Sequence, residues 1–345
     1  MKLALNLEPK IGPYGGGNAL TLTLAEGLEK SGFEISFDLT KRGLDFILML
    51  DPRWRHPLLS FTPAAMSRYV LKNRNTLIVH RINECDERKN TNFMNRKLRL
   101  ANYLADSTIF VGSWLKNLDL VDREKARMRA ETDIVIKNGS NQRIFYFKDE
   151  NEWNGKAPLK LVTHHWSPNP MKGLALYQRF DEMLQDSFYS EKFEFTYIGN
   201  VPKEAKFTHT RVIPPLHGVD LAEELRRHHV YLTGSVNEPG GNHQNEGGLC
   251  GLPIIYVDSG CMSEYCEGFG IKIQNLGQLD FALREILESY PKFRKKMRSF
   301  SNTSDSMVEE YEKHLRYLDS RRESILKQRN LFSDPAKFLR LQLPI

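Results

Sequence analysis

Short apolar segments alternate with amphipathic ones along most of the chain, and this pattern predicts strands separated by helices. An expected helix at 18–30 places Leu20, Leu24 and Leu28 on one face and ends near Gly32. Apolar strands that alternate with helices are typical of a parallel sheet covered on both faces, so the predicted fold class is α/β. The strands expected in the first half are 3–7, 33–39, 46–50, 76–80, 107–112 and 133–139.

The same alternation restarts after a polar interval at 146–158, which contains Gly155 and Pro158 and indicates a linker. We therefore predict two similar α/β domains, 1–145 and 159–311, with a C-terminal helix near 312–330 that packs back on the first. The strands expected in the second domain are 159–165, 193–199, 210–216, 230–235, 252–258 and 271–273. Its expected helices are 173–187, 220–228, 244–250 and 278–289.

Length and composition narrow the class of protein. The 345 residues suit two domains of roughly 100–200 residues each, and 40% hydrophobic with 27% charged residues excludes a disordered or fibrous chain. Apolar runs such as 46–50 are far shorter than the roughly 20 residues of a membrane-spanning helix. The first twelve residues indicate a strand rather than a signal peptide.

The cysteines favour a reducing compartment, because they show neither a CxxC pair nor zinc-ligand spacing. They are Cys85, Cys250, Cys261 and Cys266. We therefore expect a cytoplasmic protein, at most bound peripherally at the inner face of the cell membrane.

The chain is basic, with a net charge of +6 and a pI of about 9.0. This balance favours an anionic partner: nucleic acid, an acidic membrane surface or a phosphate-bearing ligand. Basic residues cluster at 292–298 and 321–329. These clusters are expected to contact solvent or, alternatively, an anionic membrane.

The segment 235–260 is the strongest candidate for a binding site. It follows an expected strand, and open α/β sheets bind ligands at the carboxyl ends of their strands. Gly240 and Gly241, followed by Asn242, allow a ligand to approach the backbone near a helix start, where amides attract phosphate. Glu246 at that helix start can bond the vicinal hydroxyls of a ribose, and Glu238 can hold another polyol. The alternative is structural: a helix-start acid beside an ordinary turn.

The stretch EGGLCGLP at 246–253, with Glu238 before it, resembles the retaining glycosyltransferases of family 4, which have the GT-B fold. Glycines replace the alanines usual in that family, and Gly240 replaces a common aromatic residue. The resemblance implies two Rossmann-like domains that face a cleft, the first for the acceptor and the second for the nucleotide-sugar donor. It implies that Glu246 holds the nucleotide ribose and that Glu238 lies against the donor sugar. Gly260 and Glu264 resemble the family's Gly-Gly-x-Pro-Glu segment.

Lys172 and Gly173 match the Lys-Gly that the family places at a helix start after the first strand of the second domain. A lysine there suits a diphosphate, because its charge, the helix dipole and the amides act together. Ser167 stands where the family usually has an arginine, beside His164 and His165. We expect His165 or backbone amides to replace part of the arginine's role.

The first domain supplies further candidates through the same resemblance. The glycine-rich segment 12–18 matches the family's opening loop, and Gly16 and Gly17 are expected to face the donor diphosphate or the acceptor. His80 is expected at the end of a strand, where the family's histidine reaches the donor sugar; the alternative is a core or capping histidine.

Three more residues, Arg81, Asn83 and Asp86, are candidates for shaping the acceptor side. The Asn138-Gly139 pair, by contrast, is interpreted as a structural turn rather than a catalytic element.

The predicted reaction is retaining transfer of a hexosyl or deoxyhexosyl group (EC 2.4) from a nucleotide diphosphate sugar to an acceptor hydroxyl. No Asp-x-Asp sequence is present, so Lys172 and amides rather than a metal ion are expected to stabilise the leaving diphosphate. No cofactor is expected besides the donor. The resemblance implies a glycan or lipid-linked saccharide acceptor in surface polysaccharide assembly.

Three alternatives remain at this point. A GT-B nucleotide-sugar epimerase would use the same donor site. A phosphorylase would need a lysine for pyridoxal phosphate, and none stands out. A basic nucleic-acid-binding protein is suggested by the charge alone, without a recognised motif.

Overall fold

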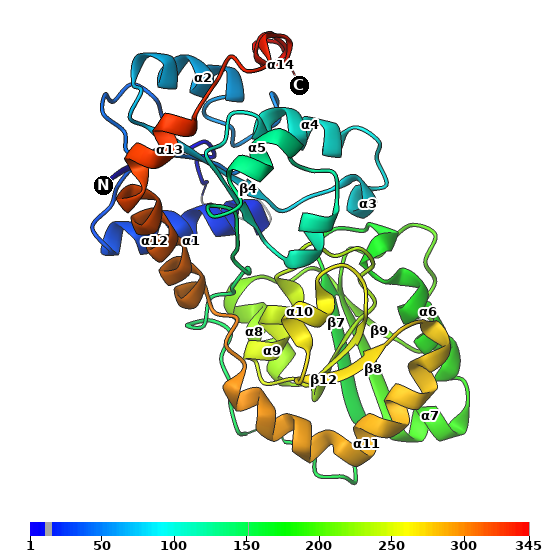
Figure 1. The fold of residues 1–345 in the computed structure, drawn as a ribbon. Helices are drawn as coiled ribbons and strands as arrows, with labels where there is room; N and C mark the ends of the chain where they lie inside the picture. The colour runs from blue at the N-terminus through cyan, green and yellow to red at the C-terminus, as the bar shows by residue number, and fades with distance from the viewer. Residues whose placement is uncertain (11–15, 151, 345) are drawn as a thin grey trace. The chain divides into compact units, whose positions relative to one another are not determined.

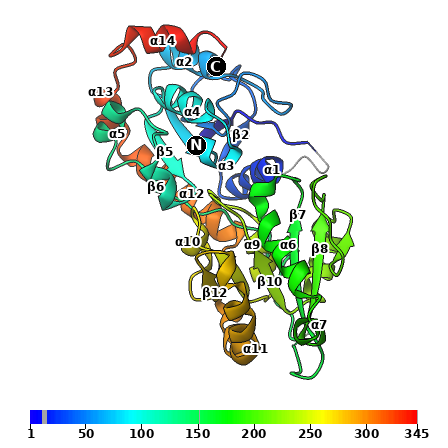
Figure 2. The same ribbon diagram turned by 90° about the vertical axis from the view of Figure 1, so that its right-hand side faces the viewer.

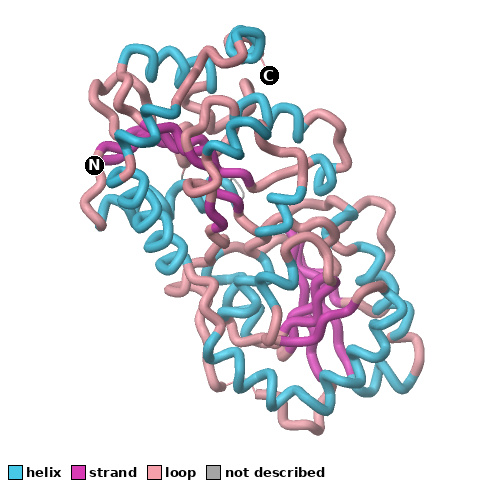
Figure 3. The backbone as a smooth tube through the Cα atoms, in the orientation of Figure 1, coloured by secondary structure: helices cyan, strands magenta, loops and turns pink. Residues whose placement is uncertain are grey.

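The computed structural model describes residues 1–10, 16–150 and 152–344 (Figure 1). The chain forms two compact units, Met1–Lys137 with Met307–Ile345 and Asn138–Ser306. Each unit has one six-stranded parallel sheet (Figure 3). Apolar runs predicted as strands form the middle of both sheets, because a strand covered on both faces needs side chains that tolerate complete burial.

The first sheet has the strand order β2-β1-β3-β4-β5-β6. Its strands are β1 (Lys2–Leu5), β2 (Glu34–Ser36), β3 (Phe46–Met49), β4 (Leu77–Ile82), β5 (Ser107–Phe110) and β6 (Ile134–Val135). Its helices are α1 (Gly16–Lys30), α2 (Pro63–Lys72), α3 (Asp86–Lys89), α4 (Met94–Asn102) and α5 (Arg123–Met128), with the 3₁₀ turn η1 (Ser113–Asn117).

The C-terminal segment completes the first unit. It contains α12 (Ser304–Ser320), α13 (Arg322–Gln328) and α14 (Pro335–Leu341). Tyr311, Leu315 and Leu318 of α12 are buried in one core cluster with α1, and the two helices lie side by side in Figure 1. Leu341 of α14 is buried in the cluster on the other face of the sheet. The tail after 330, which had no clear sequence pattern, therefore contributes to the hydrophobic core.

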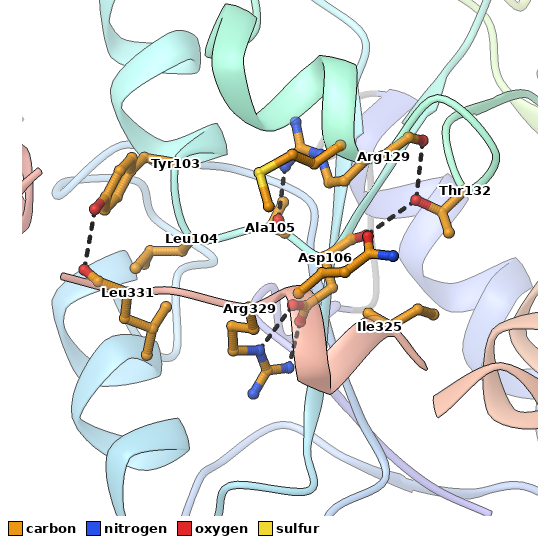
Figure 4. A pocket seen from close by; sticks show the side chains of 11 residues that line it. Tyr103, Leu104, Ala105, Asp106, Arg129, Thr132, Ile325, Arg329 and Leu331 are labelled. Atoms are coloured by element: carbon orange, nitrogen blue, oxygen red, sulfur yellow. Dashed lines mark hydrogen bonds and ion pairs between the residues drawn. The ribbon is translucent and has the colours of Figure 1, made fainter. Parts of the chain in front are cut away.

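A small pocket marks where this segment is anchored (Figure 4). Arg329 forms a buried ion pair with Asp106, at 2.5 Å, and Tyr103 donates a hydrogen bond to the carbonyl of Leu331. The pocket's volume of about 40 Å³ suits a few water molecules rather than a nucleotide. Asp106 directly precedes β5, so the pocket lies at the amino end of that strand, and we interpret it as structural.

The second sheet has the strand order β12-β11-β10-β7-β8-β9. Its strands are β7 (Leu159–His165), β8 (Phe193–Gly199), β9 (Arg211–Ile213), β10 (Val230–Thr233), β11 (Ile254–Val257) and β12 (Gly270–Ile273). Its helices are α6 (Leu174–Met183), α7 (Ser187–Lys192), α8 (Gly218–Arg226), α9 (His243–Leu249), α10 (Met262–Cys266) and α11 (Leu279–Lys296). Its 3₁₀ turns are η2 (Pro170–Lys172), η3 (Leu276–Gln278) and η4 (Met297–Ser299). Side chains of α6 and α11 share one core cluster with the strands, and Figure 2 shows α6 beside β7.

The chain connects the two units twice, near 138–140 and near 302–306, and these two segments pair with each other. Ser140 donates its N–H to the carbonyl of Asn302 (3.1 Å) and accepts from the N–H of Ser304 (2.8 Å). A Cβ at Gly139 would lie 1.9 Å from the carbonyl oxygen of Thr303, so only glycine allows this approach. The Asn138-Gly139 pair thus has a structural role.

Residues 146–158, expected as the linker, belong to the second unit. The ring of Phe147 lies 4.0 Å from the Arg294 guanidinium, and Trp153 packs edge-on against Tyr290 at 5.7 Å between ring centroids. Aromatic residues of this segment therefore pack against α11. The polar composition of the segment did not predict this packing.

Several residues of the two basic clusters, 292–298 and 321–329, form contacts within the protein. Arg294 is buried and donates a hydrogen bond to the carbonyl of Gly251. In the second cluster, Arg321 pairs with Glu131, Arg322 donates hydrogen bonds to the carbonyls of Asp45 and Asn75, and Arg329 pairs with Asp106. Most of the second cluster therefore fastens the C-terminal segment instead of facing a membrane.

Among the described residues, no helix combines the length and the apolar character that crossing a membrane requires. All four cysteines are buried thiols.

Candidate functional site

The candidate site lies in the second unit, at the carboxyl ends of β7 and β10. The chain runs outward from β7 to β8 and β9 and then returns to β10 on the other side of β7. Loops leave such a switch point in opposite directions, and open α/β sheets bind ligands there. The segments that follow these two strands carry Lys172, Glu238 and Glu246.

Lys172 and Glu238 form an ion pair, with Nζ 3.1 Å from Oε2. The Glu238 side chain is 5% exposed and that of Lys172 24%, so the pair is mostly shielded from water. Gly173, at φ +108°, makes this approach possible: a Cβ there would lie 2.6 Å from the Cα of Gly234, just beyond β10. The close backbone contact between η2 and the end of β10 brings the cation and the carboxylate together.

The loop after β11 supports Glu238 from the other side. Glu238 and Gly260 form an isolated parallel bridge, and Cys261 donates its N–H to the Glu238 carbonyl at 2.8 Å. Glu264 lies in the first turn of α10 and is half-buried. The Gly260 segment thus positions the backbone of Glu238.

A chain of hydrogen bonds holds Glu246. Its Oε2 lies 2.6 Å from Nε2 of His164, and the opposite ring nitrogen, Nδ1, lies 3.1 Å from the Tyr231 hydroxyl. A carboxylate only accepts, so His164 donates its Nε2–H to Glu246. The Glu246 side chain keeps 21% of its surface exposed. One side of its carboxyl group is therefore oriented by His164 while the group remains accessible.

His165 is placed differently from the prediction that it replaces the missing arginine. It is buried, with Nε2 2.7 Å from the Tyr177 hydroxyl and 3.1 Å from the Thr163 hydroxyl. Burial, and next the nearby His243, hold the pKa of His165 well below its usual value. A neutral, enclosed imidazole supplies no positive charge to a phosphate, so this part of the hypothesis is revised.

Ser167 is exposed, and its hydroxyl accepts a hydrogen bond from the N–H of Asn169 at 3.4 Å. Asn169 in turn caps η2 by accepting from the N–H of Met171 at 2.9 Å. Ser167 therefore helps to order the turn that presents Lys172.

The loop before α9 is anchored from within the second unit. Asn138 donates to the carbonyl of Gly240 at 2.5 Å, and the side chain of Gln244 donates to the carbonyl of Gly241 at 2.6 Å. Asn242 is the N-cap residue of α9. These contacts hold Gly240, Gly241 and Asn242 next to Glu246 and direct two of the loop's carbonyl oxygens away from a ligand.

His243, which the sequence analysis did not single out, opens α9 beside this loop. Its Nε2 lies 3.0 Å from the Thr233 hydroxyl, and its ring lies 4.9 Å from that of His165. The sequence signal that could have identified His243 is its position directly after Gly240-Gly241-Asn242. Its contact with His165 could be seen only in the folded structure.

The candidates of the first unit lie in its own elements. Gly16 and Gly17 are the exposed first residues of α1, and the preceding part of the glycine segment, 12–15, lies outside the described residues. His80 lies within β4, two residues before its end, and is completely buried. Its Nδ1 lies 3.2 Å from the Asn102 side chain, and burial, with the charge of Arg129, lowers the pKa of His80 to about 3. This placement matches a core histidine, so His80 is left out of the proposed donor site.

The candidates at the end of β4 and after it are Arg81, Asn83 and Asp86. Asp86 accepts hydrogen bonds from the N–H groups of Met94 and Asn95 and so caps α4. Arg81, within β4, is buried, and Asn83, just after the strand, is half-buried. The carboxylate oxygens of Asp86 therefore bind the backbone at the start of α4, which favours a structural role over a contact with the sugar acceptor.

Comparisons with known proteins complete the description. No family model and no curated protein matches the sequence. HepE of Anabaena, solved with UDP, is similar in structure: TM-score 0.66, 14% identity, 92% of this chain and 100% of that chain. Sucrose-phosphate synthase of Thermosynechococcus elongatus gives a TM-score of 0.63 at 13% identity, over 92% and 99% of the two chains. A glycosyltransferase of Rickettsia africae gives 0.57 at 14%, over 95% and 99%.

These similarities, together with the two parallel six-stranded sheets, show that the chain has the GT-B fold. The predicted fold class is thereby confirmed. At such low identity the comparison concerns the fold, and the activity has to be argued from the site.

Proposed function

We propose that the chain is a glycosyltransferase that moves a sugar from a nucleotide diphosphate sugar to an acceptor hydroxyl. One observation carries the proposal. The Lys172–Glu238 ion pair and Glu246 all lie on the segments that follow β7 and β10, the two strands at the switch point of the second sheet, where open α/β sheets bind ligands. The GT-B fold supports it, and one structural neighbour, HepE, was solved with UDP-glucose.

Each of the three side chains has a role that suits its chemistry. Glu246, accessible and oriented by His164, accepts hydrogen bonds from the ribose hydroxyls. Lys172 neutralises the charge that develops on the leaving diphosphate, with amides of the glycine loop as further donors. Glu238, beside Lys172, accepts hydrogen bonds from the donor sugar.

In the proposed step the bond between the anomeric carbon and the phosphate oxygen breaks, and a bond to the acceptor oxygen forms. The acceptor proton passes to the leaving diphosphate, so no side-chain nucleophile is required. Retention, a hexosyl or deoxyhexosyl group, independence of metal ions and a glycan or lipid-linked acceptor in surface polysaccharide assembly all rest on the family resemblance.

A thermal-shift screen against UDP, GDP, dTDP, CMP and their sugars tests the proposal. A ligand that binds only the native state stabilises it, by about 2.7 kcal/mol at 100 times its Kd, so one nucleotide should clearly raise the melting temperature. No shift with any nucleotide, alongside salt-dependent binding of DNA or RNA, would instead favour the nucleic-acid alternative. Conversion of a labelled donor without acceptor into a second nucleotide sugar would indicate an epimerase.

His164→Ala is expected to weaken binding of the selected nucleotide by about 10-fold. A hydrogen bond to a charged group contributes roughly 1.5–3 kcal/mol, and Glu246 would lose the donor that orients its carboxylate. His164→Gln, which keeps an N–H donor, should retain most of the affinity. Titration calorimetry measures both, with the exposed His209→Ala as the matched control. Unchanged affinity in His164→Ala would remove His164 from the site.

A further inference from the structure

An exposed aromatic pair lies at the same edge of the second sheet. Trp166, the residue after β7, is 49% exposed, whereas the other three tryptophans of the chain are at least partly buried. Its ring centroid lies 4.8 Å from that of His217, the N-cap residue of α8, with 53° between the planes. Unlike a single exposed ring, this pair presents a broad flat apolar surface, and it does so at the edge of the sheet where ligands bind.

The backbone fixes this pair relative to Glu246. Trp166 directly follows β7 and contacts His217 at the start of α8, and two positions earlier His164 binds Glu246 of α9. Asn200 extends the pairing of β7 with β8 by donating its side-chain amide to the Trp166 carbonyl at 2.7 Å. The exposed indole thus lies at the same carboxyl end of the sheet as the carboxylate proposed for the ribose.

We propose that Trp166, supported by His217, is the platform on which the base of the donor nucleotide stacks. This inference rests on the proposed function. Ribose and base are directly bonded, so a nucleotide whose ribose is held by Glu246 must place its base close by. An exposed indole with a second ring against it offers the flat apolar surface that any nucleobase can stack on. The platform contributes affinity for the base, while the choice between bases is left to the surrounding polar groups.

The inference is tested by titration calorimetry with UDP, GDP and inorganic pyrophosphate on the full chain. Trp166→Ala should weaken nucleoside diphosphate binding by about 10-fold or more, the range seen for stacked bases, and should leave pyrophosphate binding unchanged. Trp166→Phe, which keeps an aromatic face, should stay within about threefold of the unmodified chain. Phe281→Ala removes a still more exposed ring (61%) on α11 of the same unit and should change nothing.

The outcomes separate the two proposals. If the unmodified chain binds no nucleoside diphosphate, the proposed function fails and this inference fails with it. If the chain binds but Trp166→Ala binds equally well, only the platform is overturned. A loss confined to the sugar nucleotides, with free UDP and GDP unaffected, would assign Trp166 to the sugar and would also overturn it.

A second measurement covers the case in which Trp166→Ala does not fold. Nucleotide addition should quench part of the tryptophan fluorescence of the unmodified chain, and that part should be missing in Trp166→Phe. Equal quenching in both proteins would contradict stacking on Trp166.

Discussion

Lys172→Ala is expected to lower the rate of sugar transfer by about 100-fold or more, the usual effect of removing one donor that stabilises charge developing in a transition state. The ammonium group forms an ion pair with Glu238, and η2 presents it at the carboxyl edge of the sheet. Binding of the intact donor should weaken less than the rate, because the negative charge on the diphosphate grows as the bond to the sugar breaks.

The assay measures release of nucleoside diphosphate from the sugar nucleotide selected by the thermal-shift screen. Lys292→Ala, an exposed lysine on α11 of the same unit, is the matched control and should keep the full rate. Lys172→Ala also leaves the 5%-exposed Glu238 carboxylate without this partner, so a lower melting temperature is expected. Rates must therefore be compared at temperatures where both proteins are folded. A rate within threefold of the unmodified chain would rule out Lys172 as the phosphate contact.

Glu238→Ala is expected to reduce transfer by a similar factor, about 100-fold, through loss of contacts to the donor sugar and of the partner that orients Lys172. Glu238→Gln keeps the shape and one acceptor oxygen but removes the charge, so it should retain more activity than alanine. Binding of the nucleoside diphosphate alone should change by less than about threefold, because the sugar is absent from that ligand. This split distinguishes a sugar contact from a general collapse of the site.

Glu223→Gln provides the control for Glu238→Gln, since Glu223 is an exposed carboxylate of the same unit. Equal losses of transfer and of nucleoside diphosphate affinity in Glu238→Gln would place Glu238 on the nucleotide rather than on the sugar. If Lys172→Ala and Glu238→Ala both keep near-normal rates, the whole assignment of the donor site is wrong.

Much of the fold could be predicted because it depends on local patterns. The run at 46–50, for example, forms β3 with every residue buried, as a strand inside a parallel sheet requires. Several strands are shorter than expected, such as β9 at Arg211–Ile213 within 210–216, because Pro214 and Pro215 lack the N–H that a ladder needs. The order of the strands was beyond local reasoning.

The site shows the same division. Its three main residues were identified because glycines, carboxylates and a lysine stand at fixed distances after strands, and parallel strands deliver such residues to one edge. The partners of those residues come from far away in the chain: His164 and Glu246 are 82 positions apart, and Lys172 and Glu238 are 66 apart. No sequence period relates them.

His80 and His165 show why the remaining assignments needed the structure. Both stand in segments that match the family, yet packing encloses them, and burial lowers the pKa of each histidine. The sequence alone determined the two α/β units and the position of Glu238, Glu246 and Lys172 after strands, because strand patterns and glycine turns are local properties. Only the tertiary structure decided which side chains are enclosed and which remain accessible, because desolvation and hydrogen bonding depend on neighbours brought together from distant segments.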